Sequence, residues 1–152
     1  SIEERPAHVE YRREYGHWEM DCVVGKQGAS GATLLVLAER MTREEIIRKT
    51  PDRTQASVKR ELDKLERRHR KRFLQKFKAI TVDNGSEFVN SLELEASARD
   101  LGGKRIKVFY AHPYSSWERG SNENANKLVR RFIPKGTDIN NYSVEEIRRI
   151  EH

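Results

Sequence analysis

The stretch of sequence that decides the fold is Gly16-His17-Trp18-Glu19-Met20-Asp21-Cys22-Val23-Val24. Apolar Trp18 and Met20 alternate with acidic Glu19 and Asp21, and a period of two predicts a β-strand with one apolar face. A carboxylate buried in a sheet is costly unless it is paired or binds a metal ion. An edge strand would remove that cost, so both a structural and a metal-binding interpretation of Asp21 stay open.

The remainder of the chain is expected to alternate between strands and helices. Apolar runs predict strands at 32–39, 43–50, 79–83 and 106–110, and the Glu-rich start of 43–50 leaves a helix open there as the alternative. Periodicity and capping residues predict helices from Thr54 to about residue 70, at 92–101 before Gly102-Gly103, from Ser121 or Asn122 through Phe132, and from 143 to 150. This order predicts an α/β fold, in which a mixed sheet is covered by helices.

The composition favours a polyanionic partner. The chain has 30 Lys plus Arg against 24 Asp plus Glu, a formal net charge of +6. Such an excess favours nucleic acid as a partner, although many basic domains carry it for solubility. The single cysteine, Cys22, excludes an internal disulfide and a cysteine-rich zinc site. No apolar run is long enough to span a membrane and no signal core is visible, so we expect a soluble, cytoplasmic protein without a membrane partner.

Three acids are candidate metal ligands. Asp21 lies in the first strand, Asp83 precedes the turn sequence Asn84-Gly85, and Glu123 begins a helix. On that helix Lys127 and Arg130 share the face of Glu123, opposite an apolar stripe made by Ala125, Leu128, Val129 and Phe132. Carboxylates without a Cys or His cluster select hard cations, Mg²⁺ or Mn²⁺, and the neighbouring cations suit phosphates. Each acid also has a simpler interpretation: Asp83 as a turn residue, Glu123 as half of an i,i+4 ion pair with Lys127.

A family resemblance follows from motifs that occur in order. These are Gly16 to Asp21, Ile80-Thr81-Val82-Asp83-Asn84-Gly85-Ser86-Glu87-Phe88, the run from Pro113 to Asn126, and Arg130 to Asp138. Together they resemble the catalytic domain of bacterial insertion sequence 30 family transposases, which are related to retroviral integrases. The resemblance covers roughly residues 5 to 150. The stretch between Asp83 and Glu123 is longer than is usual in the family, and the surplus falls near Arg99 to Lys107.

The resemblance implies a ribonuclease H-like fold with a mixed five-stranded sheet. It implies that Asp21, Asp83 and Glu123 are catalytic and bind divalent metal, two ions of Mg²⁺ or Mn²⁺. The implied reaction is cleavage at transposon ends followed by attack of the 3′-hydroxyl on target DNA. By the same matching, Asn84 and Gly85 shape the turn at Asp83. The residues expected to contact DNA are Trp117, Arg119, Asn126, Lys127 and Arg130.

The resemblance also implies an organisation and partners. Residues 1–14 would be an arm that follows a missing N-terminal DNA-binding region, and residues 15–152 an integrase-like core, truncated at its C-terminus. The expected partners are double-stranded DNA and further copies of the chain. Two other functions stay open: an inactive or domesticated DNA-binding domain, and a nuclease that acts on RNA–DNA hybrids.

One basic stretch is not explained by the three acids. Seven Lys and Arg residues belong to the stretch from Glu66 to Lys78, both included, where the first long helix is expected to end. Two interpretations are open, a solvated helix end and a track for DNA.

Overall fold

The computed structural model describes residues 2, 5, 14–111 and 120–151. Its sheet has five strands in the order β3-β2-β1-β4-β5. Their bounds are β1 His17–Val24, β2 Thr33–Glu39, β3 Glu45–Thr50, β4 Ala79–Val82 and β5 Lys107–Tyr110. The first three strands pair antiparallel, whereas β4 and β5 run parallel to β1. The predicted mixed five-stranded sheet is therefore confirmed, with β1 at its centre.

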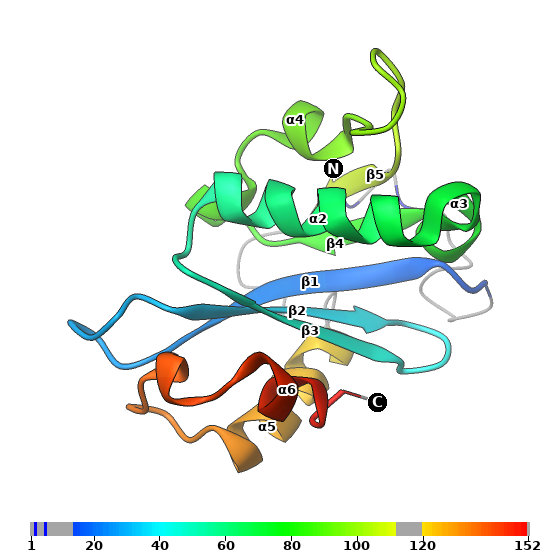
Figure 1. The fold of residues 1–152 in the computed structure, drawn as a ribbon. Helices are drawn as coiled ribbons and strands as arrows, with labels where there is room; N and C mark the ends of the chain where they lie inside the picture. The colour runs from blue at the N-terminus through cyan, green and yellow to red at the C-terminus, as the bar shows by residue number, and fades with distance from the viewer. Residues whose placement is uncertain (1, 3–4, 6–13, 112–119, 152) are drawn as a thin grey trace.

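Helices cover both faces of the sheet. Figure 1 shows α2 (Gln55–His69), α3 (Phe73–Lys76) and α4 (Ser91–Glu95) on one face. On the opposite face lie α5 (Gly120–Phe132) and α6 (Val144–Arg148). Short 3₁₀ turns are η2 (Arg70–Arg72), η3 (Ser86–Phe88) and η5 (Ile139–Asn141). Since β2 is sandwiched between the two layers, all of its residues are buried, as its continuous apolar run predicts.

The alternation in β1 separates two hydrophobic cores. Trp18 and Met20 belong to the core under α2, and Val23 belongs to the core under α5. Complete burial of a side chain of Leu size stabilises the fold by about 1.5–3 kcal/mol, and both cores contain several such residues. The two acids of the strand, Glu19 and Asp21, consequently face the α5 side.

The helix expected at 92–101 is much shorter than predicted. It ends at Glu95, because Ala96 is extended and forms an isolated bridge with Lys104. The Ser97 hydroxyl accepts hydrogen bonds from the N–H groups of Arg99 and Asp100, which offers this loop an alternative to helix.

One other expectation needs correction, and one further contact is observed. Phe132, predicted to pack on the core, is 54% exposed, and Ile133 next to it is buried instead, because α5 ends at Phe132. In the segment predicted as an arm, Ile2 and Arg5 are buried, and Arg5 donates a hydrogen bond to the Thr81 hydroxyl. These two residues therefore contact the core.

Candidate active site

Asp21 lies in β1, and Asp83 directly follows β4, the parallel strand next to β1. Glu19 is the last residue of β1 that pairs with β4, opposite Thr81, and the same register continued by two residues places Asp21 beside Asp83. Both carboxylates are partly buried. The edge-strand explanation of Asp21 is excluded, since β1 is the central strand. The fold therefore brings together two acids separated by more than sixty positions in the sequence.

The Asp21 carboxylate is held by hydrogen bonds at both of its oxygens. Oδ1 accepts from the N–H of Cys22 at 2.8 Å, and Oδ2 accepts from the Asn126 side-chain amide at 3.0 Å. Asn126, predicted to contact DNA, thus contacts a candidate catalytic acid in this structure. Its own Oδ1 is buried without a hydrogen-bond partner.

The turn after β4 fixes Asp83. The N–H of Gly85 donates to Asp83 Oδ1 at 2.8 Å, and the Asn84 side chain donates to the carbonyl of Ala111 at 3.2 Å. A Cβ at position 85 would lie 2.8 Å from Glu87 Oε1 and 2.9 Å from Asp83 Oδ1. Gly85 has φ −63°, so glycine is needed here for close approach and not for an unusual backbone angle.

Glu87 is a fourth acid that sequence reasoning missed. It is 0% exposed, and both carboxylate oxygens are buried without a hydrogen bond. Arg53 Nε lies 3.1 Å from Oε1, close enough for an ion pair but not aligned as a hydrogen bond. Burial raises the pKa of the Cys22 thiol, and Glu87, Asp21 and Asp83 raise it further, which indicates that negative charge gathers here. The signal available in the sequence was its position two residues after the Asn84-Gly85 turn.

The first turn of α5 is anchored to the central strand. The N–H of Asn122 donates to Glu19 Oε1 at 3.2 Å, and Arg40 donates to Glu19 Oε2 at 2.7 Å. Glu19 and Arg40 are both buried. Because Glu123 directly follows Asn122, this buried pair sets the position of Glu123 relative to Asp21.

Glu123 lies on the wall of a hollow between α5 and the end of β1. The same hollow is lined by Asn126, Lys127, Arg130 and Lys135. Glu123 and Lys127 are exposed, as the predicted polar face of the helix requires. Arg130 is only partly exposed and donates to the carbonyl of Val24 at 2.9 Å, and burial lowers the pKa of its guanidinium. Arg130 therefore ties α5 to the end of β1.

The predicted site residues are assembled only in part. Asn126 contacts Asp21, and Asp83 directly follows the strand next to that of Asp21, while Glu123 stands about one helical turn before Asn126 on the exposed face. Among the residues that the structure describes, no three Asp, Glu, His or Cys side chains form a ready-made metal cluster. Trp117 and Arg119 lie outside the described residues.

The available donors suit a hard cation in their chemistry. The carboxylate oxygens of Asp21 and Asp83 and the unpartnered Oδ1 of Asn126 are ligands of the kind that Mg²⁺ and Mn²⁺ prefer. Ligation by all three acids needs the exposed Glu123 side chain to turn toward the sheet.

Comparison with known proteins places this geometry in a family. Residues 12–116 match the family model described as the integrase core domain. The chain belongs to this family. The matched segment contains Asp21 and Asp83 but ends before Glu123. The family typically uses divalent metal ions.

Relatives of this integrase core include transposases. It is 37% identical to a probable transposase for insertion-like sequence element IS1161 from Streptococcus salivarius, over 91% of this chain and 36% of that protein. It is 37% identical to the transposase for insertion sequence element IS1086 from Cupriavidus metallidurans (99% and 41%). It is 33% identical to transposase InsI for insertion sequence element IS30A from Escherichia coli (96% and 35%). The chain thus spans less than half the length of these relatives.

A solved structure confirms the fold. The chain resembles a chain in the cryo-electron microscopy structure of the simian T-cell lymphotropic virus intasome in complex with PP2A regulatory subunit B56 gamma. The TM-score is 0.60 at 16% identity, over 78% of this chain and 39% of that chain. The predicted ribonuclease H-like, integrase-core fold is therefore correct.

None of the described helices is both long enough and apolar enough to cross a membrane.

Proposed function

We propose that this integrase core is the catalytic part of a DNA transposase. In this proposal Asp21, Asp83 and Glu123 together hold two divalent ions, Mg²⁺ or Mn²⁺. The reaction is cleavage at transposon ends, followed by transfer of the freed 3′-hydroxyl into target DNA. The observation that carries the proposal is that Asp21 on β1 and Asp83 at the end of β4 come from two neighbouring parallel strands, under a helix that carries Glu123. The transposase relatives support the choice of substrate.

The residues of the chain have distinct tasks in this reaction. Asn126 orients the Asp21 carboxylate, and the turn of Asn84 and Gly85 orients that of Asp83. The chemistry that bound divalent ions supply at such carboxylates is activation of the attacking oxygen and stabilisation of the leaving oxygen. Exposed Lys127 on the same hollow is placed to attract neighbouring phosphates of the strand.

The proposed partners are double-stranded DNA, both transposon end and target, and other copies of the chain. Transposition joins two ends, so we expect a homo-oligomer to assemble on DNA.

The decisive experiment is Mn²⁺-dependent nicking and strand transfer on labelled duplex DNA. Glu123→Gln keeps the size of the side chain and removes its charge, so we expect loss of both products with an unchanged thermal melt. Glu145→Gln, in the exposed first turn of α6, is the matched control and should keep full activity. Full activity in Glu123→Gln would refute the role of Glu123.

The same assay separates the other two functions. Metal-dependent nicking by the wild-type chain argues against an inactive DNA-binding domain. Cleavage of RNA–DNA hybrids without strand joining would replace the proposal with a hybrid-specific nuclease. If the isolated chain is inactive, the assay is repeated on the full-length protein, where inactivity would refute the proposal.

A further inference from the structure

A groove lined by cationic side chains lies where α2 ends, and we refer to it as the α2-end groove. Its Lys and Arg residues are Arg67, Arg68, Arg70, Lys71, Arg72 and Arg99, and His69 also lines it. All six Lys and Arg side chains are exposed. No apolar side chain is among the described residues that line it. The groove contains five of the seven Lys and Arg residues of the basic stretch that the proposed reaction left unexplained.

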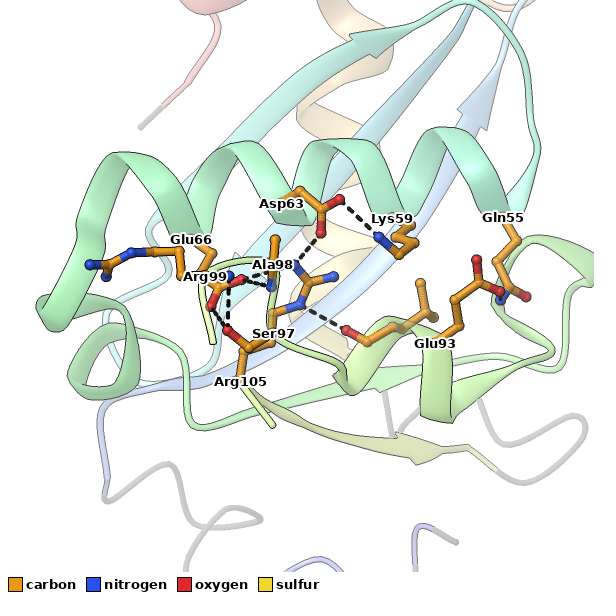
Figure 2. Close-up of polar contacts among 10 residues, drawn as sticks. Gln55, Lys59, Asp63, Glu66, Glu93, Ser97, Ala98, Arg99 and Arg105 are labelled. Atoms are coloured by element: carbon orange, nitrogen blue, oxygen red, sulfur yellow. Dashed lines mark hydrogen bonds and ion pairs between the residues drawn. The ribbon is translucent and has the colours of Figure 1, made fainter. Parts of the chain in front are cut away.

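The positive charge of the groove is not neutralised locally. In the part of the chain that the structure describes, none of the six cations forms an ion pair with a carboxylate. The nearest acids on α2 point elsewhere, because Asp63 and Glu66 both contact Arg105, which is buried (Figure 2). The formal net charge of the chain is +6, so these six side chains equal its entire excess.

Tertiary contacts bring Arg99 to this groove from a different element. Figure 2 shows the loop after α4 lying against α2, with Ser97 and the N–H of Ala98 both hydrogen-bonded to the Glu66 carboxylate. The Ser97 hydroxyl in turn accepts from the N–H of Arg99 at 3.1 Å. A solvated helix end would not need this contact, and favourable interaction with the helix dipole accounts only for cations in the last turn, Arg67 and Arg68.

The backbone at Arg70 has a conformation that is unusual for arginine. Arg70 caps α2 with φ 52° and ψ −126°, a conformation that residues with a side chain rarely adopt. Glycine is the usual residue in a left-handed cap because it carries no Cβ. Arg70 therefore adds an exposed positive charge to the groove at a position that favours glycine.

The groove is distant from the candidate active site. The start of α2 adjoins the Asp83 turn, since Arg53 contacts Glu87 there. At about 1.5 Å per residue, a helix of 15 residues places the groove roughly 22 Å away. At about 3.4 Å per base pair, this is the length of about six base pairs of duplex.

We propose that the α2-end groove binds the phosphate backbone of duplex DNA at a position separate from the scissile bond. The inference rests on the proposed function for the identity of the polyanion. Phosphates require only charge from a protein surface, whereas the centre of a protein–protein interface is rich in apolar and aromatic side chains, which this groove lacks. Binding of this kind is independent of DNA sequence.

The test measures affinity for a labelled duplex by fluorescence anisotropy, in EDTA and over a series of salt concentrations. The groove variant carries Arg67→Glu, Lys71→Glu and Arg99→Glu. The control carries Arg43→Glu, Arg60→Glu and Arg149→Glu, three exposed cations outside both the groove and the active-site hollow, so the net charge changes equally. A plot of log affinity against log salt has a negative slope, and each lost phosphate contact makes that slope shallower by about 0.9. We therefore expect the slope to become shallower by about three in the groove variant and by less than about one in the control.

Several outcomes would overturn the proposal. Equal losses in the two variants would show a general effect of net charge, and an unchanged slope in the groove variant would show no contact. Unchanged DNA affinity with lost self-association in sedimentation would assign the groove to a second copy of the chain. Should the charge reversals unfold the chain, Gln replacements at the same three positions provide the comparison. Because binding in EDTA needs no catalysis, failure here is distinct from failure of the nicking assay.

Discussion

Replacement of Arg105 by Met tests the polar network that joins α2 to the segment before β5. The Arg105 side chain is 0% exposed and lies at the centre of this network (Figure 2). Its Nε donates to the carbonyl of Leu94 at 2.9 Å, and one terminal nitrogen contacts Asp63 at 2.5 Å and Glu66 at 3.2 Å. Met keeps most of the apolar stem and removes the charge.

The expected loss of unfolding free energy is about 3 kcal/mol at pH 7. Removal of one partner from a buried ion pair costs about 3–5 kcal/mol, because the other charge stays buried without compensation. The lower end applies here, since Lys59 still contacts Asp63, and Ser97 and Ala98 still donate to Glu66. For a domain of this size such a loss lowers Tm by about 6–12 °C.

The loss should depend on pH with a definite sign. Burial alone would raise the pKa of Asp63, but hydrogen bonds from Arg105 and Lys59 outweigh it and hold that pKa below its ordinary value of 3.8. Burial would likewise raise the pKa of Glu66. Hydrogen bonds from Ser97, Ala98 and Arg105 outweigh this effect and hold that pKa below its ordinary value of 4.5. A carboxyl group whose pKa is lower in the folded state than in the unfolded state stabilises the fold at pH values above the unfolded-state pKa. This stabilisation is lost as pH falls through the folded-state pKa. The difference between wild type and Arg105→Met should therefore shrink below about pH 4.5.

Urea unfolding followed by circular dichroism, at pH 7 and at pH 4, measures both effects. Lys104→Met is the matched control, because its side chain is an exposed neighbour in the same loop and its loss should cost under about 0.5 kcal/mol. Arg105→Met should also weaken DNA binding, since it loosens the loop that carries Arg99. A loss under about 1 kcal/mol at pH 7, or one that does not change with pH, would refute the reasoning.

Two further predictions concern single backbone positions. Gly85→Ala should reduce nicking far more than it reduces Tm, because the added Cβ would lie 2.9 Å from Asp83 Oδ1 and 2.8 Å from Glu87 Oε1 and would displace both. Nicking and melting are measured in parallel, with the exposed Ser86→Ala as control. Full activity of Gly85→Ala would contradict the prediction. Arg70→Gly should raise Tm by about 2 °C, because glycine relieves the positive φ. The same change should weaken DNA binding. Unchanged affinity in the anisotropy assay would show that Arg70 has no role in DNA binding.

Local patterns were sufficient for most of the secondary structure. The alternation in β1, the apolar run in β2 and the N-cap Thr54 of α2 all depend on neighbouring residues, and each element begins within a residue or two of its predicted start. The helix predicted at 92–101 failed because its contacts are not local. Ser97 and Ala98 bind Glu66, which lies about thirty positions earlier, and these bonds hold the chain in an extended loop.

The candidate site divides in the same way. The residue types and order of Asp21, Asp83 and Glu123 indicated metal-dependent phosphoryl chemistry from the sequence, and that assignment stays a prediction for the nicking assay. The role of Asn126 could not be predicted, because a helix position says nothing about which strand the side chain meets. Glu87 belongs to the motif from Ile80 to Phe88, but its burial could not be predicted, since that burial depends on packing between η3 and α2.

The sequence by itself determined the strand and helix order, the candidate acids and the excess of positive charge, because these follow from local propensity and composition. Only the tertiary structure decided that β1 is the central strand, that Asp21 and Asp83 come from neighbouring parallel strands, and that Arg99 joins the cations at the end of α2. The physical reason is that strand pairing and buried ion pairs join residues far apart in the chain. Their energies depend on burial and geometry, which no local pattern contains.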